Sequence, residues 1–315
     1  MPHKTYERKK QKEIGLVVIY PWTQIRATVA VICTLACIWP RGAPADPPMM
    51  VFVVAGQSNA GFMAGEDIQV TVPEDTLIYI WNAACCAVPE VVGDSWMTLR
   101  AVNGKTIAPP GPGVTFARRI AAATKQRIGL IPCNLGGPIG RWQSEEILYS
   151  ACMDRHLATN LSLSGFLFYQ GEGDARSDSA ALANPIPPQP FRWRVLFERF
   201  VTDWRSETRR DLPVIFVRIA HLAEILPDTW LESPMEYWKT VQSQQDSVSL
   251  AYTRLVDSEP ATLRDAIHLD DESFHVIGNR MAEAYLEIQR QIDAAPNETG
   301  TNGPDMSDPL GESRP

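Results

Sequence analysis

The sequence predicts an α/β protein, a three-layer α/β/α sandwich with a central parallel sheet. From residue 50 onward, short apolar runs alternate with longer stretches of helical periodicity. Most of the apolar runs are nearly continuous, which indicates strands covered on both faces, as in a parallel sheet between two helical layers. With 315 residues, 45% of them hydrophobic, the chain is long and apolar enough to bury a sizeable core.

Six segments are predicted as strands, because each is a short run of mainly apolar residues, many of them β-branched or aromatic. They are residues 50–56, 77–83, 128–134, 165–171, 213–220 and 250–257. The last of them is expected near an edge of the sheet.

Four segments show the apolar spacing of amphipathic helices, as in Phe197, Phe200, Val201 and Trp204. They are residues 114–126, 191–207, 234–247 and 271–293. Two long loops rich in Pro, Gly or polar residues, 84–113 and 174–190, separate these elements. No internal repeat is found, so a single domain over 48–293 is expected. The tail, 294–315, has the composition of a disordered segment.

The first 45 residues resemble an export leader. Six basic residues precede an uninterrupted run of apolar and small residues, ATVAVICTLACIW (27–39), and Ala43-Pro44-Ala45 is a candidate cleavage site. The thirteen-residue run is shorter than the roughly 20 residues of a membrane span. We therefore expect export to the periplasm, the cell exterior or the membrane surface, and the sequence leaves open whether the leader is cleaved or stays as an anchor.

The formal net charge is −8, and because the first 26 residues are basic, the remainder is more acidic still. An acidic body argues against nucleic acid as a partner, and membrane contact is expected only through an uncleaved leader. The cysteines outside the leader lack C-x-x-C spacing, which argues against a zinc site. In an exported protein they allow one or two disulfides, with the pairing left open; for Cys133 a buried thiol is at least as good an interpretation.

Reactive and polar residues follow the predicted strands. Ser58 follows the first strand, Gly136-Gly137 and Gln170 follow two others, and Asp265 and His268 precede the last helix. In an open parallel sheet, ligands bind beyond the carboxyl ends of the strands. Together these residues are the components of acyl transfer through a serine: a nucleophile, oxyanion donors, a base and a group that orients the base.

The segment Gly56-Gln57-Ser58-Asn59 suits a nucleophile at a strand tip. The glycine permits a sharp turn, and Ser58 is expected to begin a helix whose N-terminal dipole and N–H groups favour an oxyanion. The amides of Gln57 and Asn59 are expected to fix the loop.

The chain resembles the SGNH, or GDSL-like, hydrolases, in the carbohydrate acetylesterase branch that includes sialate O-acetylesterase-like and acetylxylan esterase domains. The resemblance covers residues 50–285 and lies in six motifs in the family's order. They are G-Q-S-N (56–59), G-P-G with F-A-R (111–118), G-G to Trp (136–142), Q-G-E-x-D (170–174), D-x-x-H-L (265–269) and G-x-R-M-A (278–282). The resemblance implies a flavodoxin-like sandwich.

It also implies roles. Ser58 would be the nucleophile, His268 the general base and then acid, and Asp265 the residue that orients the imidazole. Oxyanion donors would be the Ser58 N–H, the N–H of Gly136 or Gly137, and the side-chain amide of Gln170. Pro138 stands where the family commonly has Ser or Thr, and which glycine serves is left open. Glu172 would fix the loop, and no metal or cofactor is implied.

Alternatives to these roles exist within the sequence. His221 is a second candidate base, and Asp257 and Asp270 compete less well with Asp265. Glu172 and Asp174 could form a glycosidase pair, although a structural role is favoured. Trp96 and Trp142 are the better candidates for stacking on a sugar.

The expected function is a serine esterase that removes O-acetyl groups from a carbohydrate such as acetylxylan or sialic acid through an acyl-enzyme. The alternatives are a general short-chain esterase or thioesterase, and a carbohydrate-binding module without activity. The sequence identifies neither the sugar nor the acetyl position.

Overall fold

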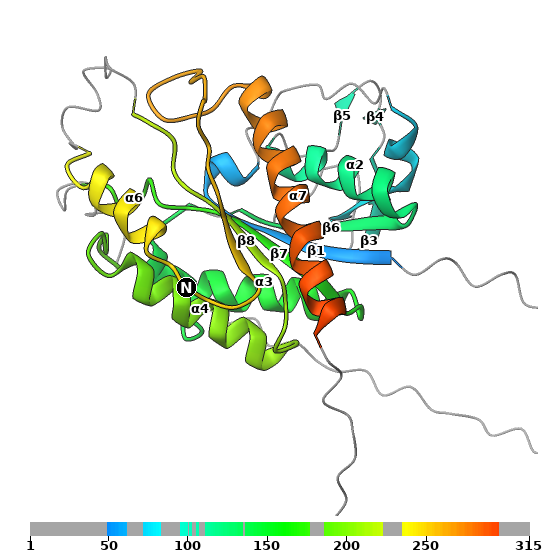
Figure 1. Ribbon diagram of the computed structural model, residues 1–315, viewed down its shortest axis with the longest axis horizontal. Helices are drawn as coiled ribbons and strands as arrows, with labels where there is room; N and C mark the ends of the chain where they lie inside the picture. The colour runs from blue at the N-terminus through cyan, green and yellow to red at the C-terminus, as the bar shows by residue number, and fades with distance from the viewer. Residues whose placement is uncertain are drawn as a thin grey trace, which may run out of the picture. The chain divides into compact units, whose positions relative to one another are not determined.

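The centre of the molecule is strand β1, Met49–Gly56, which pairs in parallel with β6 on one side and β7 on the other. A computed structural model describes residues 49–61, 72–82, 95–99, 101–102, 105–106, 111–134, 136–176, 186–222 and 235–295. Residues Val51 to Ala55 are almost fully buried, because helices cover both faces of the sheet there (Figure 1).

The main sheet has seven strands in the order β3-β2-β6-β1-β7-β8-β9. Besides β1, its strands are β2 (Ile78–Asn82), β3 (Ser95–Thr98), β6 (Arg127–Asn134), β7 (Leu163–Tyr169), β8 (Val214–Val217) and β9 (Thr253–Val256). All neighbouring pairs are parallel except β2 with β3, which is antiparallel. Two short strands, β4 (Ala101–Val102) and β5 (Lys105–Thr106), form a separate pair.

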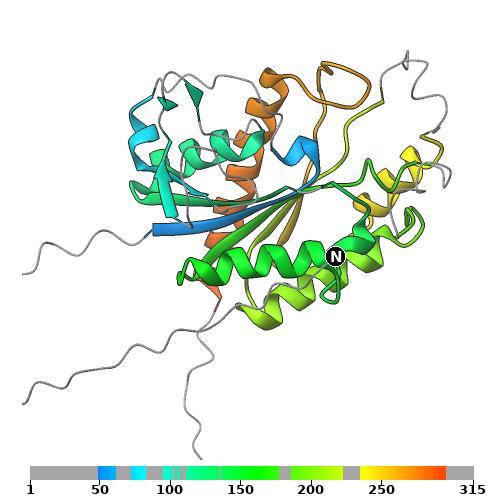
Figure 2. The same cartoon turned by 180° about the vertical axis from the view of Figure 1, so that it is seen from behind.

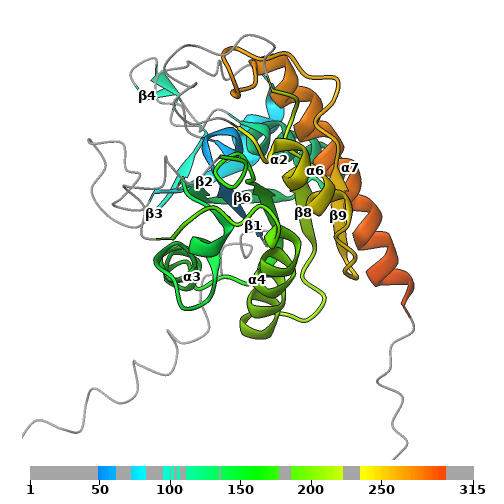
Figure 3. The same cartoon turned by 90° about the vertical axis from the view of Figure 1, so that its left-hand side faces the viewer.

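Two helical layers enclose this sheet, as Figure 2 and the edge view in Figure 3 show. On one face lie α2 (Pro112–Thr124) and α7 (Asp271–Ala294), which pack against each other where Gly278 closely approaches the backbone of Pro112. On the other lie α3 (Ile147–Ala158) and α4 (Trp193–Glu207), with α6 (Trp238–Asp246) beside α4. The predicted three-layer sandwich is confirmed.

Aromatic side chains fill both halves of the core. Under α2 and α7, Phe52 makes edge contacts with Phe116 and Tyr285 at ring-centre distances of 4.8 and 5.0 Å. Under α3 and α4, the rings come from β7 and from the apolar face of α4 that the sequence pattern predicts. They include Phe166, Phe168, Phe197, Phe200 and Trp204.

The structure contains several elements that the sequence did not predict, among them strand β3 and helix α3. Strand β3 lies inside the predicted loop 84–113 and forms an antiparallel edge, because Trp81 and Trp96 pair across β2 and β3 with rings 5.1 Å apart. Helix α3 carries only a weak amphipathic pattern, since Ser, Asp, Arg and His interrupt its apolar residues; packing of Leu148, Tyr149 and Cys152 in the core fixes it instead.

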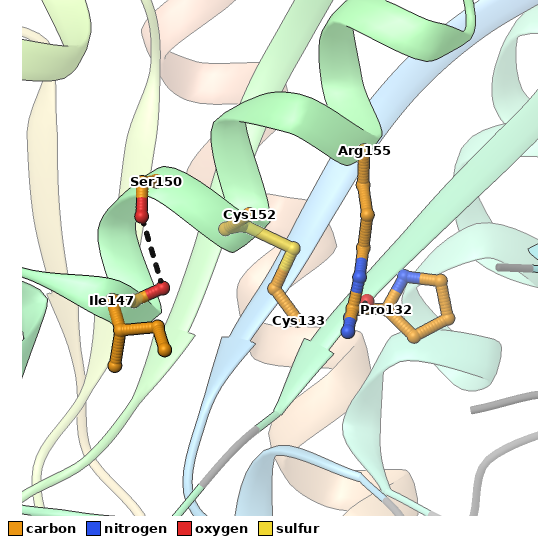
Figure 4. The surroundings of a disulfide bond; sticks show 6 residues. All are labelled: Pro132, Cys133, Ile147, Ser150, Cys152 and Arg155. Atoms are coloured by element: carbon orange, nitrogen blue, oxygen red, sulfur yellow. Dashed lines mark hydrogen bonds between the residues drawn. A yellow bond between two sulfur atoms is a disulfide. The ribbon is translucent and has the colours of Figure 1, made fainter. Parts of the chain in front are cut away.

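A disulfide joins Cys133, near the end of β6, to Cys152 in α3 (Figure 4). Both residues are almost fully buried. This settles the pairing for Cys133, for which a free buried thiol was the alternative. Arg155 lies one turn further along α3 and donates a short hydrogen bond to the Pro132 carbonyl, so two links hold the end of β6 to this helix.

The predicted export leader and the residues after 295 lie outside the described residues. The described residues all belong to one compact unit. Within the described ranges, no helix combines the length and hydropathy that a membrane span needs.

Candidate active site

The turn after β1 can be built only with glycine. Gly56 has a φ of 129°, and a Cβ there would lie 2.0 Å from the carbonyl oxygen of Tyr169 on the paired strand. The Gln57 N–H donates to the same carbonyl at 2.8 Å, so the chain leaves β1 while still held by β7. Ser58 follows, at the carboxyl end of the central strand.

Ser58 begins only a three-residue 3-10 turn, η1 (Ser58–Ala60). The expected helix is therefore present only as this short turn, which is too short to place a helix dipole behind the serine. Gly61, with a φ of 140°, ends the turn after one hydrogen bond from its N–H to the Ser58 carbonyl. Any oxyanion stabilisation at this position must come from individual N–H groups.

Three predicted residues meet in a hydrogen-bonded chain. The Ser58 hydroxyl lies 2.8 Å from Nε2 of His268, and Nδ1 of the same imidazole lies 2.7 Å from Oδ2 of Asp265. These segments are 210 residues apart in the sequence, yet the turn after β1 and the loop before α7 lie side by side (Figures 1 and 2). This order of contacts lets His268 accept the serine proton while Asp265 holds the ring.

The carboxylate of Asp265 is held by its own loop. Its Oδ1 accepts hydrogen bonds from the backbone N–H groups of Ile267 and His268 at 3.0 and 2.8 Å. Partial burial by itself would raise the pKa of this carboxyl, but these bonds and the His268 imidazole outweigh it and lower the pKa below its usual value. An ionised Asp265 accepts the Nδ1–H, which leaves Nε2 free to face Ser58.

Asn59 joins the serine turn to the histidine loop. Its Nδ2 donates to the Ile267 carbonyl at 2.9 Å and to Oε1 of Glu172 at 2.8 Å, and its Oδ1 accepts from the Leu269 N–H at 3.2 Å. Ile267 and Leu269 flank His268, so this one buried amide sets the position of the imidazole relative to Ser58. Burial raises the pKa of Glu172, and the bond from Asn59 opposes that rise.

Gln57 joins the serine turn to the other side of the site. Its Oε1 accepts from the N–H groups of Gly171 and Gly173 at 3.1 and 3.0 Å and from Nε2 of Gln170 at 3.0 Å. The two amides beside Ser58 thus both bond the 170–174 segment, and Asn59 also bonds the histidine loop.

Gln170 lies in a buried hydrogen-bond network beside the serine turn. Its side chain is fully buried, and its Nε2 donates to Gln57, to the Gly137 carbonyl and to Oδ2 of Asp174, while its Oε1 accepts from the Trp193 indole. Its two N–H bonds are thus shared among three acceptors within the protein. This arrangement favours a positioning role for Gln170, and its role as an oxyanion donor stays a prediction.

Asp174 is the centre of this buried network. It accepts from Gln170 and from the backbone N–H groups of Ile139 and Gln189, each at 2.7 Å. Burial raises the pKa of Asp174 to about 6, although the three hydrogen bonds oppose the rise. The glycosidase alternative for Glu172 and Asp174 has no support here, because both carboxyls are buried and hold loops.

The backbone N–H groups of Ser58 and Gly137 are available as candidate oxyanion donors. Gly137 has a φ of 146°, and the bond from Gln170 fixes its carbonyl at 3.2 Å; a Cβ at this position would collide with Arg141. In the part of the chain that the structure describes, the N–H groups of Ser58 and Gly137 have no hydrogen-bond acceptor. Gly136 is exposed, with open space where its Cβ would be.

The remaining candidates have other roles. His221 pairs with Glu259 at 3.0 Å, Asp270 caps α7 through the Ser273 N–H, and Asp257 accepts from the Glu259 N–H. Trp142 is fully buried in the core and Trp96 packs on Gly129 near the start of β6, so neither offers a sugar platform at Ser58. The sequence did not predict the role of Trp193, whose indole N–H donates to Oε1 of Gln170 at 2.8 Å. A tryptophan on the buried face of a helix shows no pattern that would indicate such a bond.

Among the described residues, no group of three or more His, Cys, Asp or Glu side chains is arranged to hold a metal ion.

Comparison with solved structures supports the fold. An Arabidopsis thaliana protein aligns over 76% of this chain and 98% of its own, with 22% identity and a TM-score of 0.57. NanS aligns over 78% and 99%, with 17% identity and a TM-score of 0.55. The carbohydrate acetylesterase XAC1771 of Xanthomonas citri aligns over 77% of this chain and 56% of its own, with 19% identity and a TM-score of 0.56.

Comparison with curated protein sequences finds no match. At family level, residues 48–287 match the model of the carbohydrate esterases described as sialic acid-specific acetylesterase. That match spans most of the chain and contains both the Ser58 turn and the His268 loop, and so the chain belongs to this family of carbohydrate esterases.

Proposed function

We propose that the protein is a serine esterase that removes O-acetyl groups from a carbohydrate through an acetyl-enzyme. The observation that carries this proposal is the contact chain from Ser58 through His268 to Asp265, at the carboxyl end of the central strand. Membership of a carbohydrate esterase family supports the substrate class.

In the first half of the reaction, Nε2 of His268 takes the hydroxyl proton as Oγ of Ser58 attacks the acetyl carbonyl. The N–H groups of Ser58 and Gly137 stabilise the oxyanion that forms; each such donor contributes about 3 kcal/mol in acyl transfer. The imidazolium then gives its proton to the departing sugar oxygen, which leaves an acetyl group on Ser58.

In the second half, His268 takes a proton from water, and the resulting attack releases acetate and regenerates the Ser58 hydroxyl. Asp265 stays ionised throughout and stabilises the imidazolium. The His268 side chain is 16% exposed, so part of the imidazole remains accessible to substrate and water.

We also propose that the protein acts outside the cytoplasm. The apolar run with a cleavage candidate in the first 45 residues supports this, as does the Cys133–Cys152 disulfide, because such bonds persist in oxidising compartments.

The test is acetate release from acetylated xylan, O-acetylated sialic acid and short-chain nitrophenyl esters, with the parent and the Ser58→Ala variant side by side. We expect release from acetylated sugars by the parent alone, and equal melting temperatures for both proteins. Equal release by Ser58→Ala would overturn the serine mechanism. A clear preference for thioesters or nitrophenyl esters over every acetylated sugar would favour a general esterase, and glycan binding without hydrolysis would favour a binding module.

A further inference from the structure

Two aromatic residues lie at the same edge of the sheet as Ser58. Phe191 precedes α4 and Tyr237 precedes α6, and each of these helices connects two parallel strands. Such a helix begins at the carboxyl edge of the sheet, which is the edge where ligands bind in open α/β sheets. Helices α4 and α6 are neighbours (Figures 1 and 3), and the ring centres of Phe191 and Tyr237 lie 5.3 Å apart. We call these two residues the aromatic pair.

The ring of Phe191 is open to solvent. The residue is 67% exposed, and in the part of the chain that the structure describes it is the only exposed aromatic residue. It meets Tyr237 edge to face, at an interplanar angle of 67°. Val195, in the first turn of α4, is 51% exposed as well. Single exposed apolar residues are common, but a ring held by a second ring is a preorganised contact surface.

The segment after β7 holds both members of the aromatic pair. Oδ1 of the buried Asp174 accepts from the Gln189 N–H at 2.7 Å, and Gln189 lies two residues before Phe191. The next carbonyl along the chain, that of Ala175, accepts from the Tyr237 N–H at 3.0 Å. The pair is therefore tied to one buried segment and not to the surface alone.

The same segment is bonded to the serine turn. Oε1 of Gln57, the residue before Ser58, accepts from the Gly173 N–H at 3.0 Å. Between Gly173 and Ala175 the chain covers at most about 7 Å. The aromatic pair thus has a fixed position relative to the nucleophile, and it lies further along the same edge of the sheet.

A sugar ring suits such a surface. The C–H groups of a pyranose form an apolar face, and the negative face of an aromatic ring attracts them. Phe191 carries no hydrogen-bonding group, so it favours this apolar face and does not compete for hydroxyl groups. Membership of a carbohydrate esterase family makes a sugar the ring-shaped ligand expected at this edge.

We propose that Phe191 and Tyr237 form a stacking subsite, which binds one sugar residue of a glycan while another residue of the same glycan presents its acetyl group to Ser58. The inference rests on the proposed function and specifies its substrate as an oligosaccharide or polysaccharide. A contact this far from the reacting atoms is kept in the ground state and in the transition state, so it lowers KM for long substrates and leaves kcat unchanged.

The experiment varies the length of the glycan and the aromatic ring separately. Acetate release is measured on acetylated xylo-oligosaccharides and on O-acetylated sialic acid oligomers, each of one to six residues. The proteins are the parent, Phe191→Ala, Phe191→Tyr and Ser58→Ala. Leu157→Ala is the matched control, since Leu157 is 59% exposed near the end of α3, a helix that begins at the carboxyl edge and ends at the opposite one.

We expect kcat/KM of the parent to rise by about 5- to 10-fold from one sugar residue to the length that reaches the aromatic pair, the gain expected for partial burial of an aromatic side chain. Phe191→Ala loses this rise through KM and keeps the parent's kcat/KM on the single acetylated sugar. Phe191→Tyr retains the rise because it retains the ring. Leu157→Ala behaves as the parent at every length.

A parent whose kcat/KM does not rise with glycan length would overturn the proposal, and so would a Phe191→Ala variant that keeps the rise. Equal losses at all lengths in Phe191→Ala would also overturn it, because they would mean that the ring only supports the loops. These results leave the esterase intact. They differ from failure of the proposed function, in which the parent releases no more acetate than Ser58→Ala.

Discussion

The two sides of Ser58 are built differently. On the base side, the chain from His268 to Asp265 lies near the surface, with the Asp265 side chain 44% exposed. On the oxyanion side, Gln170 and Asp174 are fully buried and are held by three backbone or indole N–H groups. Groups that exchange protons must reach substrate and water, whereas groups that only fix loops are strongest where water is excluded.

This contrast predicts that changes on the two sides of Ser58 affect different properties, turnover on one side and stability on the other. Changes on the exposed side should reduce turnover with little effect on folding. Changes on the buried side should reduce stability first, since an unpaired buried polar group costs about 1 to 3 kcal/mol. Four variants test this contrast.

The largest effect is expected for Asp265→Asn. The asparagine oxygen still accepts from Ile267 and His268, so the loop is kept, but its NH2 group faces Nδ1 and favours the wrong imidazole tautomer. We expect kcat to fall by about 10³- to 10⁴-fold with a nearly unchanged melting temperature. Asp257→Asn is the control and should keep its activity. A loss of less than tenfold for Asp265→Asn would remove Asp265 from the mechanism.

Asp174→Asn tests the buried side by its pH dependence. Because burial raises the pKa of Asp174 from 3.8 to about 6, the unfolded chain loses this proton at lower pH than the folded one. The carboxyl therefore favours folding most below pH 4 and loses about 3 kcal/mol of that contribution as the pH rises through 6. The variant lacks this titration.

Urea unfolding at pH 4, 5, 6 and 7.5 measures this contrast. The parent's free energy of unfolding relative to Asp174→Asn should decrease with pH and level off above about 7. A relative stability that increases with pH would contradict the raised pKa.

Loss of the disulfide should act on stability as well. Cys133 and Cys152 are 19 residues apart, and a loop of this size corresponds to about 2 to 3 kcal/mol. We expect a reductant to lower the melting temperature of the parent and to leave the Cys133→Ala/Cys152→Ala variant unchanged. Insensitivity of the parent to reductant would show that the bond does not form or does not stabilise the fold.

The smallest effect is expected for Glu172→Gln. The glutamine oxygen can still accept from Asn59, and the change removes a buried carboxyl whose Oε2 has no hydrogen-bond partner among the described residues. Above the raised pKa of Glu172, the stability should stay within about 1 kcal/mol of the parent or exceed it. Turnover should fall less than tenfold. Glu172→Ala, which removes one of the two acceptors of Asn59 Nδ2, is the contrasting variant. Equal free energies of unfolding for the two variants would show that the bond between Asn59 and Glu172 does not stabilise the fold.

Much of the fold follows from local pattern. The apolar runs around β1, β6 and β7 and the amphipathic faces of α4 and α7 are visible in the sequence, because burial on a sheet or a helix face demands them. Helix α3 and strand β3 could not be found this way. Their stability depends on a disulfide and on a cross-strand tryptophan pair, which are contacts between distant residues.

Motif and spacing in the sequence are enough to predict that Ser58, Asp265 and His268 act together, because their order is typical of acyl transfer. The folded chain was needed to show that Asn59 and Gln57 hold the serine turn against the 170–174 segment, and that Gln170 is buried with its amide hydrogen-bonded. A glutamine in the sequence looks the same whether its amide faces a substrate or the core. Its hydrogen-bond partners are known only after folding brings Gln170 next to Gln57, 113 residues away in the chain.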